Sequence, residues 1–245
     1  MAASDGKPGI LDCLAAGDLL IFDGASGTYL QNNGLEPGGS PELMNVNNPE
    51  TVQGMAKQYF DAGSDIVLTN TFGGNKFMLK RYGAEERLFE LSKAGAELAR
   101  AAAPEGKFVA GSIGPTGEFI EPLGTATEDE LFDTFSEMSK AFEEGGADAV
   151  MIETQLGLEE AEIAIRAAKE STDLVVMATM VFDKGPRGYF TMMGVTPEQA
   201  VEALEKAGAD VVGTNCGNGI ERMVEIATRM RAVTDKYLVV QSNAG

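Results

Sequence analysis

The sequence predicts an α/β protein that folds as a (β/α)8 barrel, and three features of its 245 residues lead to this prediction. Short apolar runs alternate with segments of helical period, and the runs are apolar on both faces, as buried parallel strands are. A Gly-(Ser/Ala)-Asp pattern also recurs before every second run, which fits a barrel whose interior layers come from alternate strands. An open doubly wound sheet is the alternative. It is disfavoured because no Gly-X-Gly-X-X-Gly motif follows a predicted strand.

Seven apolar runs rich in β-branched residues are the predicted strands. In chain order they are LLIFDG (19–24), DIVLTN (65–70), FVAGSI (108–113), AVMIET (149–154), LVVMATM (174–180), DVVGTNC (210–216) and YLVVQSN (237–243). Between them apolar residues return every three or four positions, most clearly at 130–146, 159–170 and 197–208, which predicts helices there. We therefore expect a single domain over residues 1–245 that carries seven of the eight strands of a barrel.

The repeated pattern marks the junctions where helices should end and strands begin. Its copies are AGSDIV (62–67), GGADAV (145–150) and AGADVV (207–212), before the second, fourth and sixth predicted strands. Because glycine adopts the left-handed conformation without steric cost, each copy is expected to end the preceding helix at its glycine.

Composition limits the class of partner and the compartment. The net charge is −19 with only 19 basic residues, and both nucleic acids and anionic membranes require a basic face. No apolar stretch is long enough for a membrane helix, and the N-terminal segment does not resemble a signal peptide, so a cytoplasmic protein is expected. The two cysteines, Cys13 and Cys216, lie far apart in sequence, which does not indicate a disulfide framework.

In a barrel the functional residues lie at the carboxyl ends of the strands. Here those ends are polar, whereas the strand interiors are almost purely apolar. The polar residues are Asp23, Asn70, Thr71, Ser112, Glu153, Thr154, Thr179, Asn215, Cys216, Ser242 and Asn243. Glycines follow the same ends and allow backbone amides to approach a ligand. The sequence therefore predicts a site at one mouth of the barrel.

The two carboxylates in this set differ in how strongly their positions indicate contact with a ligand. Glu153 ends a buried run, so it needs a partner, a solvated mouth or a ligand amine, because an unpaired buried charge is costly. Asp23 precedes Gly24 and suits a turn equally well, and Thr71 could equally satisfy loop amides.

The cysteines and the missing residue types narrow the chemistry. Cys13 lies beside apolar residues on a predicted N-terminal helix and is interpreted as packing, and Cys216 alone would more often be a small buried side chain than a ligand. Without histidine there is no imidazole base and no histidine-ligated metal, and no lysine ends a strand to form a Schiff base. A hydrolase using Asp23 and Glu153 stays open. Sulfur or metal chemistry at Cys216 also stays open, although catalytic zinc usually takes three protein ligands.

Five segments occur together in a fixed order: IFDGASGTYLQ (21–31), GSDIVLTNTFGGN (63–75), GSIGPTG (111–117), DAVMIET (148–154) and GTNCGNG (213–219). They resemble the motifs of the homocysteine S-methyltransferase family, most closely those of the homocysteine-binding, N-terminal domains of cobalamin-dependent methionine synthases. The resemblance covers nearly the whole chain and implies a (β/α)8 barrel, in agreement with the prediction from strands and repeats.

The resemblance also implies site residues. In the family, zinc is held by a cysteine after the sixth strand and an adjacent pair after the eighth. Cys216 matches the first cysteine and the pair has no counterpart in this sequence, so the resemblance implies a C-terminally truncated barrel with one of three zinc ligands. Asp23 and Glu153 match positions that hold the amino group of homocysteine, and Gly24 and Thr71 match positions near its carboxylate.

The implied activity is methyl transfer to the zinc-activated thiolate of homocysteine, which gives methionine. The implied donor is methylcobalamin on a separate corrinoid-binding domain or protein, with a folate-binding partner. S-methylmethionine or a betaine-like compound stays open as the donor within the same barrel. Two alternative functions also remain: a corrinoid-linked methyltransferase or demethylase barrel with another substrate, and a non-catalytic barrel that binds a small amine or a partner protein.

Overall fold

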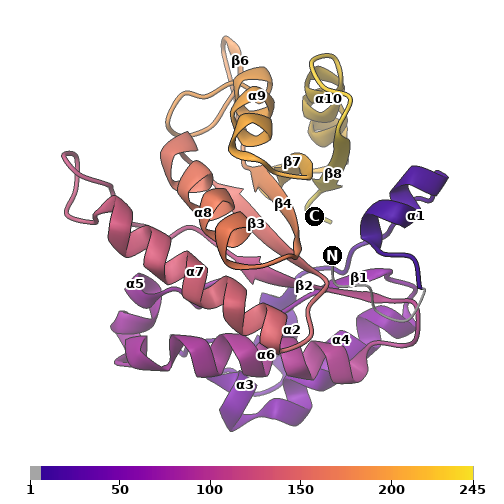
Figure 1. Ribbon diagram of the computed structural model, residues 1–245, viewed down its shortest axis with the longest axis vertical. Helices are drawn as coiled ribbons and strands as arrows, with labels where there is room; N and C mark the ends of the chain where they lie inside the picture. The colour runs from indigo at the N-terminus through magenta and orange to yellow at the C-terminus, as the bar shows by residue number, and fades with distance from the viewer. Residues whose placement is uncertain (1–6, 245) are drawn as a thin grey trace.

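The computed structural model describes residues 7–244 and shows a curled parallel sheet with helices packed on its outer face (Figure 1). The helices are α1 (Ile10–Ala16), α2 (Ser26–Asn32), α3 (Met44–Asn47), α4 (Pro49–Asp61), α5 (Lys76–Leu79), α6 (Leu88–Ala102), α7 (Glu128–Glu144), α8 (Leu158–Ser171), α9 (Pro197–Ala207) and α10 (Ile220–Arg231), with 3-10 turns at Lys80–Tyr82 and Glu85–Arg87. The strands are β1 (Ile66–Leu68), β2 (Phe108–Ile113), β3 (Ala149–Gln155), β4 (Val175–Met180), β5 (Asp183–Gly185), β6 (Gly188–Phe190), β7 (Val211–Asn215) and β8 (Tyr237–Gln241).

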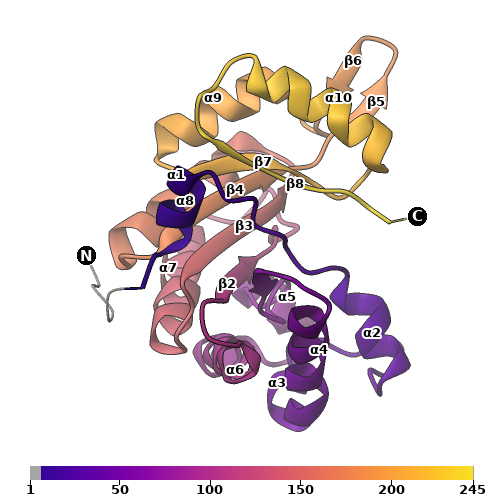
Figure 2. The same ribbon diagram turned by 90° about the vertical axis from the view of Figure 1, so that its right-hand side faces the viewer.

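Within residues 7–244, six strands form one parallel sheet in the order β1-β2-β3-β4-β7-β8. A parallel bridge between Phe22 and Ile66 adds the segment before α2 beside β1. The strands thus follow chain order, and the sheet curls so that this segment and β8 are its two edges (Figure 2). The fold is an incomplete (β/α)8 barrel, as predicted. A doubly wound sheet would reverse its strand order at a switch point.

The strand side chains alternate between two apolar clusters. The inner cluster includes Ile66, Met151 and Met177 from β1, β3 and β4, and Ile10 of α1 packs against it. The outer cluster, which includes Val150 of β3, packs against the helices. Because both faces of each central strand are buried, the strands read in the sequence as continuous apolar runs.

The first predicted strand, 19–24, is wrong as a regular strand, because only Phe22 forms a bridge. This segment has a partner on one side alone, and Leu19 and Ile21 are 86% and 55% exposed. The other six predicted runs are the six strands of the sheet. The prediction also omits the β5–β6 hairpin, whose three-residue strands flank Pro186 and Arg187 and contain no apolar run.

The helices predicted from the periodicity are confirmed. The segments predicted at 130–146, 159–170 and 197–208 are α7, α8 and α9. Two of these helices begin with capping boxes, at Thr127 in α7 and Thr196 in α9, which satisfy backbone amides at the helix start. Cys13 of α1 packs against the inner cluster, as expected. Across residues 7–244, no helix combines the length and apolar character that a membrane span requires.

The glycines of the repeated pattern are left-handed, as predicted. Gly63, Gly146 and Gly208 have φ of 111°, 83° and 107°. A side chain at any of them would strain the backbone.

The aspartates that follow these glycines make the same contact three times. Each carboxylate accepts a hydrogen bond of 2.8 Å from the backbone of the preceding strand segment: Asp65 from Ile21, Asp148 from Val109 and Asp210 from Val176. Each also pairs with a basic side chain: Lys107, Arg100 and Lys169, respectively. The repeat is therefore a clamp that fixes one strand to the next at the amino ends of the strands.

We predict that Asp65→Ala lowers the free energy of unfolding by roughly 1–3 kcal/mol, since it leaves the Ile21 amide without its acceptor and removes the Lys107 pair. Burial raises the pKa of Asp65, but hydrogen bonds from Lys107 and Ile21 outweigh it and lower the pKa overall. The stabilisation is therefore present above the unfolded-state pKa and is lost as pH falls through the folded-state value.

Urea unfolding at neutral and acidic pH measures this. The control is Asp61→Ala, which removes an exposed pair with Lys57 and should cost less than about 0.5 kcal/mol. Equal losses in the two variants would contradict the clamp.

Candidate functional site

Polar side chains replace apolar ones on the inner face at the carboxyl ends of the strands. Ser112, Glu153, Thr179 and Asn215 lie two or four residues after inner-cluster members Ala110, Met151, Met177 and Val211. Side chains along a strand alternate, so these four continue the inward-facing positions. All four are at most 8% exposed. They form a polar layer above the apolar barrel interior, as predicted for the mouth.

Glu153 is held by two donors. Ser112 Oγ donates to Oε1 at 2.6 Å, and Asn215 Nδ2 donates to Oε2 at 3.0 Å. Burial raises the pKa of Glu153 to about 7, while the Ser112 hydrogen bond lowers it. No cationic side chain is among the hydrogen-bond partners of this carboxyl in residues 7–244. A carboxylate fixed in this way can receive an external cation.

Asp23 lies on the edge segment and is less well satisfied. The Leu68 amide donates to Oδ2 at 2.9 Å, whereas the buried Oδ1 has no hydrogen-bond partner among the described residues. Burial raises the pKa of Asp23 to about 8; the Leu68 amide lowers it and the charge of Glu153 raises it. The two acids thus interact across the mouth, and Oδ1 of Asp23 can accept a hydrogen bond from a ligand.

A bulge in β3 shapes the site beside Glu153. Ile152 pairs with Ala178 but Gln155 pairs with Met180, so β3 contains one more residue than β4 over this stretch. Thr154, inside the bulge, has φ of 60°. The left-handed region is unfavourable for a β-branched residue, and such strain concentrates at functional sites.

Cys216 has the same unusual conformation, with φ of 57°. Its Sγ accepts a hydrogen bond from Thr154 Oγ1 at 3.7 Å, so the two left-handed residues meet through their side chains. Its amide donates to the Gln241 carbonyl at 3.1 Å, which joins the end of β7 to β8. Burial raises the pKa of the Cys216 thiol; the Thr154 hydrogen bond lowers it and the charge of Glu153 raises it.

Gly24 and Thr71 are the other two predicted substrate-binding residues. They differ in whether their hydrogen-bond donors are free to bind a ligand. Gly24 is exposed, and its amide makes no hydrogen bond to any residue in 7–244. A Cβ there would lie 3.1 Å from the ring of Tyr59, so glycine keeps this approach open. Thr71 is fully buried, and its hydroxyl donates to the Ser112 carbonyl at 2.8 Å. The structure therefore offers the Gly24 amide to a ligand and uses the Thr71 hydroxyl to support β2.

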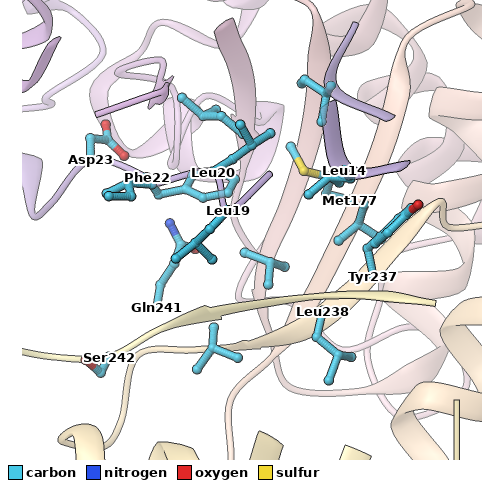
Figure 3. A pocket seen from close by; sticks show the side chains of 16 residues that line it. Leu14, Leu19, Leu20, Phe22, Asp23, Met177, Tyr237, Leu238, Gln241 and Ser242 are labelled. Atoms are coloured by element: carbon cyan, nitrogen blue, oxygen red, sulfur yellow. The ribbon is translucent and has the colours of Figure 1, made fainter. Parts of the chain in front are cut away.

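An open cleft of about 480 Å³ separates the edge segment from β8 (Figure 3). Leu14 and Tyr237 lie near one end, and Asp23 and Ser242 lie at the other (Figure 3). The buried Oε1 of Gln241, which also lines the cleft, has no partner among the described residues. The wall of the site is therefore incomplete on the Asp23 side.

The described residues do not form a complete metal centre. In residues 7–244, no group of three or more His, Cys, Asp or Glu side chains is arranged to hold a metal ion. Of the two cysteines, Cys216 lies at the mouth. Cys13 lies in α1 and packs against the inner cluster. The residues present therefore do not fit the three-cysteine zinc site implied by the sequence resemblance, and supply one sulfur of it.

The sequence prediction does not give the contacts of Asn215 and does not name Tyr59. Asn215 is recognisable as polar at a strand end, but its contacts with Glu153, Thr154 and Cys216 depend on how β3, β4 and β7 are aligned. Tyr59 of α4 lies beside Gly24 and donates to the Ala25 carbonyl at 2.8 Å. In the sequence, Tyr59 is recognisable only as part of the helical pattern of α4, and that pattern does not indicate a functional role.

Comparison with known proteins gives a consistent result. The family model described as homocysteine S-methyltransferase matches residues 20–245. Methionine synthase of Mycobacterium leprae is 30% identical over 244 residues, which cover 93% of this chain and 20% of that protein. Betaine–homocysteine S-methyltransferase 1 of Danio rerio is 32% identical, over 96% of this chain and 58% of that protein. The chain thus spans about a fifth of the methionine synthases it matches.

The fold is also found in a solved structure. The homocysteine methyltransferase MmuM from Escherichia coli, in its metallated form, superimposes with a TM-score of 0.82 at 21% identity. The match covers 96% of this chain and 87% of that one. It supports the incomplete barrel described above.

We predict that Ser112→Ala raises the pKa of Glu153 above about 7, because the variant loses the donor that favours the ionised carboxylate. Carboxyl ¹³C NMR titration of the ligand-free protein measures this. Ser139→Ala, which removes a buried hydroxyl bonded to Phe135 within α7, is the control and should leave the Glu153 titration unchanged. An unchanged pKa in Ser112→Ala would show that this hydrogen bond does not stabilise the ionised form.

Proposed function

The chain belongs to the homocysteine S-methyltransferase family, and we propose that it binds homocysteine at the barrel mouth as part of an enzyme that methylates the thiol to give methionine. One observation carries this proposal. Asp23 and Glu153 face the same mouth without a cationic partner, and Oδ1 of Asp23 has no donor among the described residues. A buried and a partly buried carboxyl arranged in this way suit an ammonium group.

In the proposed complex the ammonium lies between Asp23 and Glu153. The ligand charge lowers both pKa values, which are about 8 and about 7 in the ligand-free protein, so both acids ionise as the amine binds. Ser112 and Asn215 keep the Glu153 oxygens in place. Binding is therefore coupled to proton release from the acid pair.

The proposed position of the ligand carboxylate is near Gly24, whose free amide can donate a hydrogen bond. Thr71 is retained as a proposed substrate-binding residue on the sequence resemblance. Its hydroxyl already donates to Ser112, so it would have to exchange that bond for one to the ligand.

The thiol of homocysteine is proposed to lie toward Cys216. We propose Cys216 as one sulfur ligand of a zinc site whose remaining ligands are not among the described residues. This chain's own contribution to the chemistry is to bind and orient the substrate. The acid pair holds the amino group of homocysteine, and the thiol of homocysteine lies on the Cys216 side of the mouth.

Methylcobalamin on a corrinoid-binding domain or protein remains the proposed methyl donor, with a folate-binding partner and a cytoplasmic location. The methionine product is supported by the match of nearly the whole chain to about a fifth of two methionine synthases. The proposed donor and partners rest on the motif resemblance, and the proposed location rests on the sequence composition. Betaine is the competing donor, because the Danio rerio relative is named for it. Assays of homocysteine methylation with each donor distinguish the two.

We predict that Glu153→Gln and Asp23→Asn each weaken homocysteine binding by roughly tenfold to a hundredfold, as expected for losing a charge-assisted hydrogen bond. Calorimetry measures the affinity. Binding of 4-mercaptobutanoate, which lacks the amino group, should change little in either variant. Glu159→Gln, on the exposed surface of α8, is the matched control. Equal weakening of both ligands would contradict the assignment of these acids to the amine.

The same site predicts a pH dependence. Because the acid pair must lose protons to bind the ammonium, affinity should rise from about pH 6 to about pH 8, through the pKa values of about 7 and about 8. Calorimetry in buffers of different ionisation enthalpy should detect proton release on binding. Affinity that falls over this range would exclude the raised pKa values as the binding determinant.

For Cys216 we predict weak, substoichiometric zinc in the unaltered chain that falls further in Cys216→Ser, since one sulfur is too few for a stable zinc centre. Metal analysis after dialysis measures this, with Cys13→Ser as the control that keeps the mouth intact. The same zinc content in Cys216→Ser and the unaltered chain would exclude Cys216 as a ligand.

A further inference from the structure

We propose that Asn215, the last residue of β7, is a positioning residue that fixes the Glu153 carboxylate for an ammonium ligand and links it to the Cys216 turn. The inference rests on the proposed function, since it concerns the same acid pair. Asn215 is 2% exposed and lies across β4 from Glu153, on the inner face of the sheet.

The orientation of the Asn215 amide is determined by its neighbours. Its Oδ1 accepts from the Thr154 amide at 2.9 Å and from Thr179 Oγ1 at 2.8 Å. Its Nδ2 faces Glu153 Oε2 at 3.0 Å and Thr154 Oγ1 at 2.8 Å. The flipped amide would place its NH₂ group against the Thr154 N–H and its oxygen against a carboxylate, so it is excluded.

The hydrogens of this amide can be accounted for one by one. An amide has two, and three acceptors lie around Nδ2: Thr154 Oγ1 at 2.8 Å, Glu153 Oε2 at 3.0 Å and Cys216 Sγ at 3.5 Å. The two hydrogens go to the two nearer acceptors, Thr154 and Glu153. The Thr154 hydroxyl is then free to donate to Cys216 Sγ at 3.7 Å. One continuous chain of hydrogen bonds therefore runs from the carboxylate through Asn215 and Thr154 to the sulfur.

This chain gives Asn215 a role beyond filling space. Glu153 is held at Oε1 by Ser112 and at Oε2 by Asn215, and no other side chain in residues 7–244 donates to it. Without Asn215 the carboxylate keeps one anchor and can rotate away from the position that faces Asp23. The left-handed Thr154 also loses the nearer acceptor of its amide, Asn215 Oδ1 at 2.9 Å, and keeps Thr179 Oγ1 at 3.4 Å. The expected consequence is loss of discrimination for the amine more than loss of the fold.

The test compares binding of homocysteine and 4-mercaptobutanoate by calorimetry in Asn215→Ala, Glu153→Gln and the double variant. The measured quantity is the ratio of the two affinities. We expect Asn215→Ala to lower this ratio at least about fivefold, and to lower it by less than about twofold when Glu153 is already glutamine, because Asn215 acts through that carboxylate.

Asn218→Ala is the matched control, since Asn218 is a buried asparagine three residues on whose amide donates to the Phe182 carbonyl instead. It should leave the ratio unchanged. If Asn215→Ala does not fold, as judged by thermal unfolding, Asn215→Ser replaces it. The serine hydroxyl is too short to restore the contact with Glu153, so the same result is expected.

Three outcomes overturn the proposal for Asn215 alone: an unchanged ratio in the Asn215 variant, equal weakening of both ligands, or a full additional effect in the Glu153→Gln background. If the unaltered chain does not bind homocysteine, or binds both ligands equally, the proposed function fails and this inference fails with it. The two failures are therefore distinguishable.

Discussion

The placement of two carboxyls above an apolar barrel interior, Glu153 buried and Asp23 partly buried, is the constraint on which the rest of the site depends. Removing a carboxylate from water without a partner costs several kcal/mol, so the surrounding structure must supply donors or the group must hold its proton. Both responses are present here. Glu153 has two donors and a pKa of about 7; Asp23 has one donor to its side chain and a pKa of about 8. The acid with fewer donors retains its proton to higher pH.

Conformational strain lies next to the buried Glu153. The register shift in β3 between Ile152 and Gln155 includes Thr154, which lies in the left-handed region. Cys216 adopts the same conformation after β7, and Asn215 and Thr154 join the two turns. Strained residues persist where neighbours over-determine them. The polar layer therefore both stabilises the buried charge and offsets the backbone strain near it.

The sequence predicts the parts of this structure that depend on local pattern. Six strands follow from the apolar runs, the left-handed glycines from the repeated Gly-(Ser/Ala)-Asp pattern, and the position of Glu153 at the mouth from its place at the end of a buried run. It does not predict features that depend on which strand lies beside which. The bulge at Thr154 is a register effect between β3 and β4, and the bonds of Asn215 require β3, β4 and β7 to be neighbours. The hydrogen bond from the Thr71 hydroxyl to the Ser112 carbonyl likewise joins the loop after β1 to the neighbouring strand β2.

The two halves of the acid pair are supported unequally, and this has consequences for ligand binding. Glu153 lies within the central sheet, flanked by β2 and β4, whereas Asp23 lies on an edge segment with one bridge and an open cleft beside it. The Asp65 clamp, which holds Ile21, joins the edge segment to β1 together with backbone hydrogen bonds between Ile21 and Ile66 and between Asp23 and Ile66. A ligand that binds both acids would connect the central sheet, which carries Glu153, to the edge segment, which carries Asp23. Part of its binding free energy would then be spent on ordering the edge segment, so affinity for the amine should depend on the clamp as well as on the acids themselves.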